Sequence, residues 1–95
     1  MTYGISHFFP GGTEAQYEAT MVAMNGEAGV IPDGQIFHAA GPAKGGWQVV
    51  AVHETKESWD AFVESVFVPR VAAGIPGGFT VPPTETTWEV THLHP

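Results

Sequence analysis

The segment from Gly46 to Gly74 most constrains what this 95-residue chain can fold into. Residues 47–54 alternate as a strand does and run directly into an amphipathic helix pattern. The apolar side chains of that pattern lie on one helical face: Trp59, Phe62, Val63, Val66, Phe67 and Val71. A strand and a helix this short cannot shield so much aromatic surface alone. The helix is therefore expected to pack on a sheet built from the rest of the chain.

The rest of the chain predicts three more strands and one more helix. The strands cover residues 3–9, 35–40 and 85–93, and the helix covers residues 14–25. Thr13, with Gln16 three residues later, predicts a capping box at the start of that helix. Loops are expected over residues 27–34 and 41–46, and the second loop is the turn of a hairpin. Pro69 predicts a kink or break of the second helix near residues 66–68.

The order strand, helix, strand, strand, helix, strand predicts an α+β, ferredoxin-like domain over residues 1–95. Right-handed crossovers give an antiparallel sheet of order 4-1-3-2, with both helices on one face. The strand over residues 47–54 is apolar on both sides, which is not typical of a sheet with one wet face. A second copy of the chain is therefore expected to cover the other face, as a homodimer.

Charge and composition exclude several classes of partner. The net charge is −7, and only Lys44, Lys56 and Arg70 are positive, which disfavours nucleic acid and anionic membrane surfaces. Charged residues make up only 14% of the chain, too few to cover the surface of a monomer. This also favours a homodimer. The absence of cysteine gives no sign of a disulfide scaffold.

Targeting signals are not apparent in the sequence. The first residues show no basic and apolar leader pattern, and no apolar run is long enough to span a bilayer. We therefore expect a cytoplasmic protein.

The five histidines are the main candidates for chemistry, because imidazole transfers protons near neutral pH. Strand directions place His53 and His92 near Tyr3 at one end of the sheet. If these positions face the helices, Trp88 and Phe62 form the wall of a pocket around them. The alternative is that both histidines lie at the rim and bond to backbone or solvent.

His38 lies in the middle of a strand with apolar neighbours, so it needs a polar partner, in a pocket or across a dimer. His7 is a similar but weaker candidate. Aromatic and methionine side chains on the helices are expected either to fill the core or to form the wall of a ligand cavity. The predicted binding residues are Tyr17, Met21, Trp59, Phe62 and Trp88.

Three runs, residues 36–42, 46–50 and 53–62, resemble small bacterial proteins of the dimeric α+β barrel superfamily, the antibiotic biosynthesis monooxygenase-like proteins. The resemblance implies a homodimer whose sheets close into a barrel, and a pocket between sheet and helices. It does not fix an activity. Members include cofactor-free monooxygenases, polyketide cyclases, isomerases, haem-degrading enzymes, haem chlorite dismutases and proteins of no known reaction.

No metal or organic cofactor is expected. His92 and His94 have a spacing that some metal sites use, but no third ligand is visible. Any of the histidines could be an axial haem ligand, but Arg70 is the only arginine available for the propionates.

The sequence leads to two hypotheses. In the first, a cofactor-free enzyme of the monooxygenase or cyclase type acts on a polyketide-like or phenolic small molecule. His53 is then the base or orienting group, with His92, His38 and Tyr3 as its partners. In the second, the chain is a non-catalytic ligand-binding or structural homodimer. An apolar cavity of roughly 300 Å³ or more with a histidine in its wall would favour an enzyme or binder.

Overall fold

The computed structural model describes residues 2–26 and 32–94. The elements are β1 (Tyr3–Pro10), α1 (Glu14–Asn25), β2 (Gln35–Ala43), β3 (Gly46–His53), a long helical segment and β4 (Thr84–Glu89). The helical segment has three parts: α2 (Lys56–Phe62), a π-helical turn η1 (Val63–Phe67) and α3 (Val68–Ala73). This is the expected α+β, ferredoxin-like fold.

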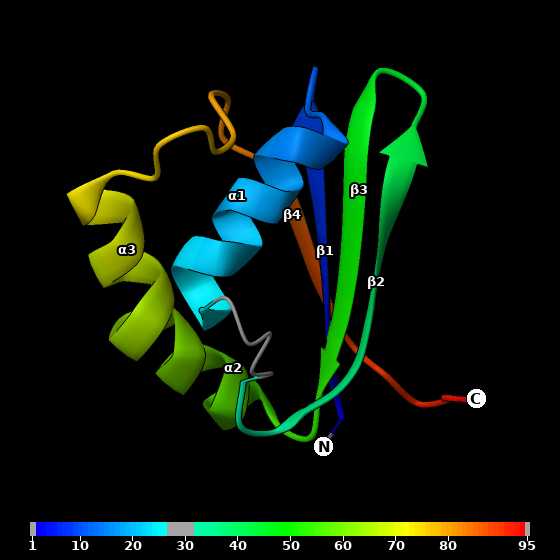
Figure 1. Ribbon diagram of the computed structural model, residues 1–95. Coiled ribbons are helices and arrows are strands. Elements are labelled where there is room, and N and C mark those ends of the chain that lie inside the picture. The colour runs from blue at the N-terminus through cyan, green and yellow to red at the C-terminus, as the bar shows by residue number, and fades with distance from the viewer. Residues whose placement is uncertain (1, 27–31, 95) are drawn as a thin grey trace.

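The four strands form one antiparallel sheet of order β2-β3-β1-β4, which is the predicted order read from the other edge. Figure 1 shows the helices on one side of the sheet, and no helix or strand of residues 2–26 and 32–94 lies over the opposite face. We call these sides the helix face and the outer face. Among the described residues, no helix is long and apolar enough to cross a bilayer.

The register determines which side chains face the helices. Ile5 pairs with Ala51 and is 2% exposed, so it lies at the centre of the core. Phe9 stacks on Phe79 from the loop before β4, with ring centroids 3.7 Å apart. Directly paired residues of neighbouring strands have their side chains on the same face of the sheet. The alternation along β1 therefore shows which side chains of β3 and β4 face the helices.

The helix starts follow the sequence closely. Thr13 and Gln16 form the predicted capping box, with Thr13 N–H donating to Gln16 Oε1 and Gln16 N–H donating to Thr13 Oγ1. Thr55 caps α2 by accepting the Ser58 N–H at 3.0 Å.

Pro69 perturbs the second helix without breaking it. The Val68 N–H bonds to the Val63 carbonyl, five residues back, so the chain makes one wide π-helical turn before α3. Pro69 has no N–H and therefore donates no helical hydrogen bond. The wide turn accommodates this residue at the start of α3. The disturbance lies where the sequence predicts a kink or break, and it takes the form of a π-helical turn.

Two strand boundaries differ from expectation. β2 continues to Ala43, so the predicted hairpin loop shrinks to a turn at Lys44 and Gly45, where Gly45 has φ +86°. β4 ends at Glu89 rather than at Leu93, although the Val90 N–H still donates to the Thr2 carbonyl at 2.9 Å. Residues 27–31 of the predicted loop 27–34 lie outside the described residues.

The outer face carries large apolar side chains at the Gly4 end of the sheet. Val52 pairs with Gly4 and Phe37 on this face, and Trp88 pairs with Gly4 from β4. Phe37 is 43% exposed and Trp88 is 39% exposed. Large exposed apolar groups on one sheet face are typical of an interaction surface.

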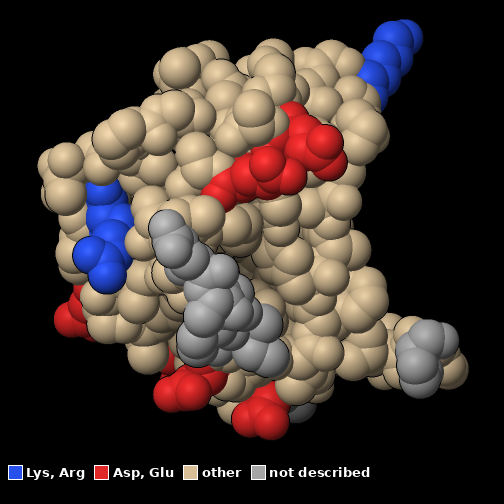
Figure 2. Space-filling model, viewed as in Figure 1, with Lys and Arg blue, Asp and Glu red and all other residues tan. Residues whose placement is uncertain are grey.

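Charge is sparse on the surface as well. On the face in Figure 2, acidic side chains form separate groups, and basic side chains lie only near the edges. Uncharged surface separates them, as the low charged fraction of the sequence implies.

Candidate functional site

A cavity of about 70 Å³ lies between the helix face of the sheet and the helices. We call it the core cavity. It is lined by Ile5, His7, Phe9, Tyr17, Thr20, Met21, Met24, Asn25, Pro32, Gln35, His38, Val49, Ala51, Trp59, Phe62, Phe67 and Phe79. Most of its wall is apolar and aromatic, and two histidines interrupt that wall.

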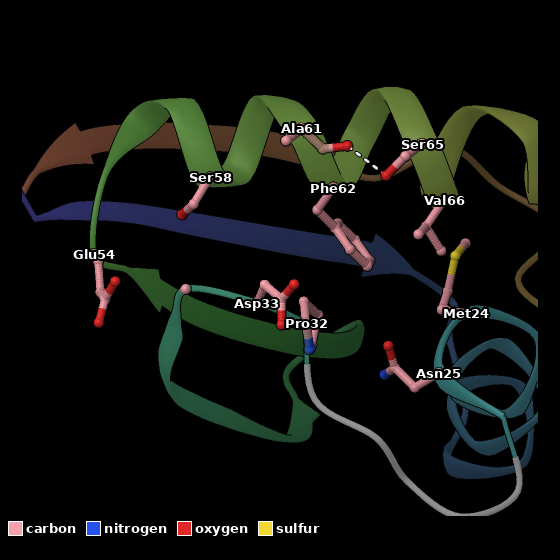
Figure 3. A pocket seen from close by; sticks show the side chains of 11 residues that line it. Met24, Asn25, Pro32, Asp33, Glu54, Ser58, Ala61, Phe62, Ser65 and Val66 are labelled. Atoms are coloured by element: carbon pink, nitrogen blue, oxygen red, sulfur yellow. Dashed lines mark hydrogen bonds between the residues drawn. The ribbon is translucent and has the colours of Figure 1, made fainter.

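Two open grooves adjoin the core cavity and share part of its wall. The α3 groove, about 480 Å³, is lined by Phe9, Thr20, Met24, Phe67, Val71, Gly74, Ile75, Phe79, Thr80, Val81, Pro82 and Pro83. The Asp33 groove, about 580 Å³ and drawn in Figure 3, is lined by Met24, Asn25, Pro32, Asp33, Gly34, Glu54, Ser58, Ala61, Phe62, Ser65 and Val66.

Met24 lines the core cavity and both grooves. Its side chain points from α1 toward Val66 of η1, and Phe62 points from α2 into the space beneath the helices (Figure 3). A methionine side chain is flexible and adapts to irregular space. Met24 is therefore the partition that separates the cavity from the grooves.

Tyr17 and His38 form the first polar pair of the cavity. Tyr17 Oη lies 2.6 Å from His38 Nε2, which joins α1 to β2. The Tyr17 ring also lies 5.4 Å from the Trp47 ring, which helps to fix its direction. Partial burial lowers the pKa of His38 and raises the pKa of Tyr17, although the His38 residue is exposed on the single chain. Near neutral pH the two groups therefore share a hydrogen bond between uncharged partners.

His7 and Glu85 form the second polar pair. His7 Nε2 lies 2.7 Å from Glu85 Oε2, across the pairing of β1 with β4. The His7 residue is only 8% exposed, whereas the Glu85 side chain is 52% exposed. The pair therefore runs from the cavity wall to solvent.

His53 does not line the core cavity, although the sequence favours it as the base. It is completely buried, and its Nδ1 lies 2.9 Å from Ser58 Oγ. Ser58 Oγ in turn donates to the Thr55 carbonyl at 3.0 Å, so it accepts from His53 Nδ1–H. Burial lowers the pKa of His53, so the ring is neutral near pH 7.

His53 Nε2 has no hydrogen-bond partner among the described residues. The Trp59 ring contacts the imidazole edge-on, with centroids 5.5 Å apart. These contacts make His53 a positioning residue that joins the end of β3 to the first turn of α2.

The other residues of the predicted His53 pocket do not come together. Tyr3 does pair with His53 across the strands. His92, however, lies beyond the end of β4, is exposed, and bonds only to Thr91 Oγ1 at 2.9 Å among the described residues. Its exposure agrees with the alternative that His92 lies at the rim.

Trp88 is on the outer face, not in the predicted pocket wall. It pairs with Gly4, and a side chain at Gly4 would come within 2.6 Å of the indole ring. The missing side chain at Gly4 thus leaves room for the indole on that face. The predicted pocket with a Trp88 wall does not form.

Four of the predicted binding residues do lie together in the cavity wall: Tyr17, Met21, Trp59 and Phe62. His38 joins them. Sequence reasoning gave less weight to His7 and missed Glu85. The alternation Tyr3, Ile5, His7, Phe9 was a signal for His7, since it puts the imidazole beside two apolar positions on one face.

No cluster of three or more metal-binding side chains occurs in residues 2–26 and 32–94. The cavity wall holds two imidazole–oxygen pairs among its aromatic side chains. Such pairs can accept, hold and pass on protons.

Structure comparison finds the same fold in solved proteins. One, from Chloroflexus aurantiacus, is provisionally assigned as an antibiotic biosynthesis monooxygenase; it has a TM-score of 0.68 and 11% identity, over 100% of this chain and 98% of that one. Rv0793 from Mycobacterium tuberculosis has a TM-score of 0.64 and 18% identity, over 97% and 96%.

A third structure is a variant of SnoaB, a cofactor-independent oxygenase from Streptomyces nogalater. It has a TM-score of 0.62 and 15% identity, over 99% of this chain and 96% of that one. No protein-family model matches this chain, and no curated protein sequence does. The chain therefore has the ferredoxin-like fold of the antibiotic biosynthesis monooxygenase-like structures.

Proposed function

We propose that this protein is a small enzyme, without metal or organic cofactor, that removes a proton from a polyketide-like or phenolic molecule. The observation that carries the proposal is the 2.6 Å bond between Tyr17 and His38 in the aromatic wall of the core cavity. The fold shared with a cofactor-independent oxygenase is consistent with it.

The pair Tyr17–His38 suits the oxygen atom of such a molecule. When the Nε2–H of neutral His38 donates to Tyr17 Oη, His38 Nδ1 can accept the proton of a phenolic O–H, and the electron pair stays on the substrate as a phenolate. The Tyr17 O–H is then free to donate to the developing negative charge. The anion then either reacts with oxygen, as in a monooxygenase, or closes a ring, as in a cyclase.

This proposal assigns new roles to the predicted site residues. His38 takes the role of base that the sequence favoured for His53, because His38 lines the cavity and His53 does not. Tyr17, Met21, Trp59 and Phe62 form the binding wall. Tyr3 and His53 support the end of the sheet, and His92 has no role.

The space available limits how the ligand binds. A cavity of about 70 Å³ is smaller than the ~150 Å³ of an apolar cavity that holds benzene, and smaller than the roughly 300 Å³ of a typical ligand site. The ligand must therefore displace Met24 and extend from the cavity into a groove. The α3 groove supplies further apolar wall for this.

We also propose that the protein works as a homodimer through the outer face of the sheet. Ile36, Phe37 and Trp88 are each more than a third exposed on a single chain. Burial of this apolar surface by a second copy would stabilise both molecules.

The function is tested by turnover with two probes: naphthohydroquinone, followed by oxygen uptake, and a poly-β-keto ester, followed by ring closure. The wild-type protein should convert at least one probe faster than buffer alone does. The variants His38→Gln and Tyr17→Phe should each lose about tenfold or more, and the matched variant His94→Gln, on the exposed tail, should not.

If the protein turns over neither probe faster than buffer does, the enzyme hypothesis is wrong. The alternative of a non-catalytic binding or structural dimer then remains. Full activity of His38→Gln would contradict the role of the Tyr17–His38 pair. Binding without turnover, seen as quenching of Trp59 fluorescence, would favour the binding protein.

A further inference from the structure

We propose that Phe79 is a gate through which an uncharged aromatic molecule passes from the α3 groove into the core cavity. The inference rests on the proposed function, because it concerns entry to the same cavity. It adds a route, a specificity-determining residue and a moving segment. The moving segment is the loop of residues 74–83 between α3 and β4, which we call the gate loop.

The wall that the core cavity shares with the α3 groove identifies the passage. The side chains that line both spaces are Phe9, Thr20, Met24, Phe67 and Phe79. All of them except Phe79 lie on β1, α1 or η1. Phe79 is therefore the part of this wall whose backbone can move without moving a strand or a helix.

The ring of Phe79 closes the passage by stacking on Phe9. The two ring centroids are 3.7 Å apart, and the ring planes differ by 10°. Gly12 makes room for the ring, because a Cβ there would lie 2.9 Å from Phe79 Cε1. Phe79 is only partly buried, so the other side of its ring faces the groove and solvent. One stacked pair is a modest interaction, so the ring can swing away at low cost.

The gate loop is held lightly. Among the described residues, the only backbone hydrogen bond within residues 75–83 joins the Gly78 N–H to the Ile75 carbonyl. Gly74 and Gly77 have φ +85° and +76°, a region that glycine adopts without strain. Loop residues that tolerate such changes of backbone angle serve as hinges. Phe79 thus lies directly after a segment that can bend.

Charge favours this route over the other groove. No charged side chain lines the α3 groove in the part of the chain that the structure describes, whereas Asp33 and Glu54 line the Asp33 groove. An ion that entered the α3 groove would lose its hydration without gaining a partner. An uncharged aromatic molecule instead gains from the apolar wall along the whole path. The gate therefore selects for uncharged, flat molecules.

The geometry of the gate loop offers a reversible lock. A Cβ at Gly77 would lie 3.7 Å from Ala19 Cβ on α1, within the range of about 3.5–4.5 Å that disulfides use. Figure 1 shows the loop crossing from α3 to β4 near α1. The chain has no cysteine, so the double variant Ala19→Cys/Gly77→Cys has no competing thiol. Oxidation ties the loop to α1, and reduction frees it.

The test compares the oxidised and reduced forms of this double variant, which have the same cavity wall. Stopped-flow tryptophan fluorescence measures the binding and release of naphthohydroquinone without oxygen. The reduced form should bind as fast as the wild-type protein. The oxidised form should bind about tenfold more slowly or less, and release should slow as well, because a gate that closes again behind the ligand limits both steps.

Phe79 itself is tested in the locked protein. Phe79→Ala removes the ring, so the oxidised form should bind fast again. Val81→Ala is the matched control, because Val81 lies on the same loop and lines the α3 groove but not the core cavity. It should leave binding slow. Circular dichroism checks that each variant is folded, and Phe79→Leu, which loses the stacked ring but keeps apolar volume, replaces an unfolded Phe79→Ala.

The outcomes separate this inference from the proposed function. Equal binding rates of the oxidised and reduced forms, or no binding to either, would contradict the gate loop. Slow binding that neither Phe79 variant relieves would show that Phe79 is not the gate. If the lock controls binding but no probe is turned over, the gate stands and the enzyme is wrong. If turnover is present and the lock does not change it, the gate is wrong and the enzyme stands.

Discussion

At the scale of single residues, burial sets the charge of two imidazoles. It lowers the pKa of His38 and of the fully buried His53, so both are neutral near pH 7. Neutral imidazole is the form that can accept a proton, so His38 is ready to act near neutral pH and somewhat below it.

The same shifts predict how stability depends on pH. The unfolded chain binds protons at the ordinary histidine pKa of about 6.5, whereas the folded chain resists protonation of His38 and His53. Stability from these groups is full above about pH 6.5 and is lost as pH falls toward the lowered values. Urea unfolding should give a lower midpoint at acidic pH, and His53→Gln should flatten the slope. A midpoint that is unchanged or higher in acid would contradict this.

Gly4 and Gly41 form a matched pair on the outer face. A side chain at Gly4 would come within 2.6 Å of the Trp88 ring, whereas nothing lies within 4 Å of one at Gly41. Gly4→Ala should therefore cost about 1–3 kcal/mol, and Gly41→Ala should cost much less. Chemical denaturation of the two variants measures this, and equal losses would contradict the placement of Trp88.

Met24 controls the size of the cavity. Met24→Ala should join the core cavity to both grooves, because this side chain lines all three. It should cost about 2–5 kcal/mol of stability but tighten the binding of naphthohydroquinone, measured by calorimetry without oxygen. Met21→Ala, which affects only the core cavity, is the control. Tighter binding to Met21→Ala than to Met24→Ala would exclude Met24 as the partition.

At the scale of elements, two helix caps have different tasks. Thr13 caps α1 on the exposed surface, whereas Thr55 caps α2 where Ser58 holds the buried His53. Thr13→Ala should cost about 1 kcal/mol and Thr55→Ala up to about 2 kcal/mol. Thermal unfolding of both variants tests this, and a smaller cost at Thr55 would show that the His53 contact does not depend on the cap.

Local sequence signals predict most elements because those elements depend on neighbours in the chain. Thr13 and Gln16 define a helix start, and Pro69 marks the site of a disturbance. The form of that disturbance was not predictable. A π-helical turn and a break both accommodate proline, so the sequence pattern alone does not choose between them.

The candidate site was only partly predictable, because it depends on strand register. Helix periodicity was enough to bring Trp59, Phe62 and Tyr17 to one cavity. The placement of Trp88 and His92 depends on the register in which β4 pairs with β1. A shift of that register by one residue moves every side chain of the strand to the opposite face of the sheet. In the structure Trp88 pairs with Gly4, and nothing near Trp88 in the sequence reveals this register.

At the scale of the whole molecule, both faces of the sheet carry apolar side chains, but their surroundings differ. The helix face holds the core cavity and its two histidine pairs. The outer face exposes Phe37 and Trp88 on a single chain. The low charge of the sequence agrees with such a surface being covered by a second copy.

The central claim is that a twin molecule covers the outer face, so that the sheet is shielded on both sides. Sedimentation equilibrium at micromolar concentration tests it most directly. The wild-type protein should have twice the 10.1 kDa mass of one chain, and Phe37→Asp should sediment as one chain that remains folded. A wild-type protein that sediments at 10.1 kDa would contradict the claim.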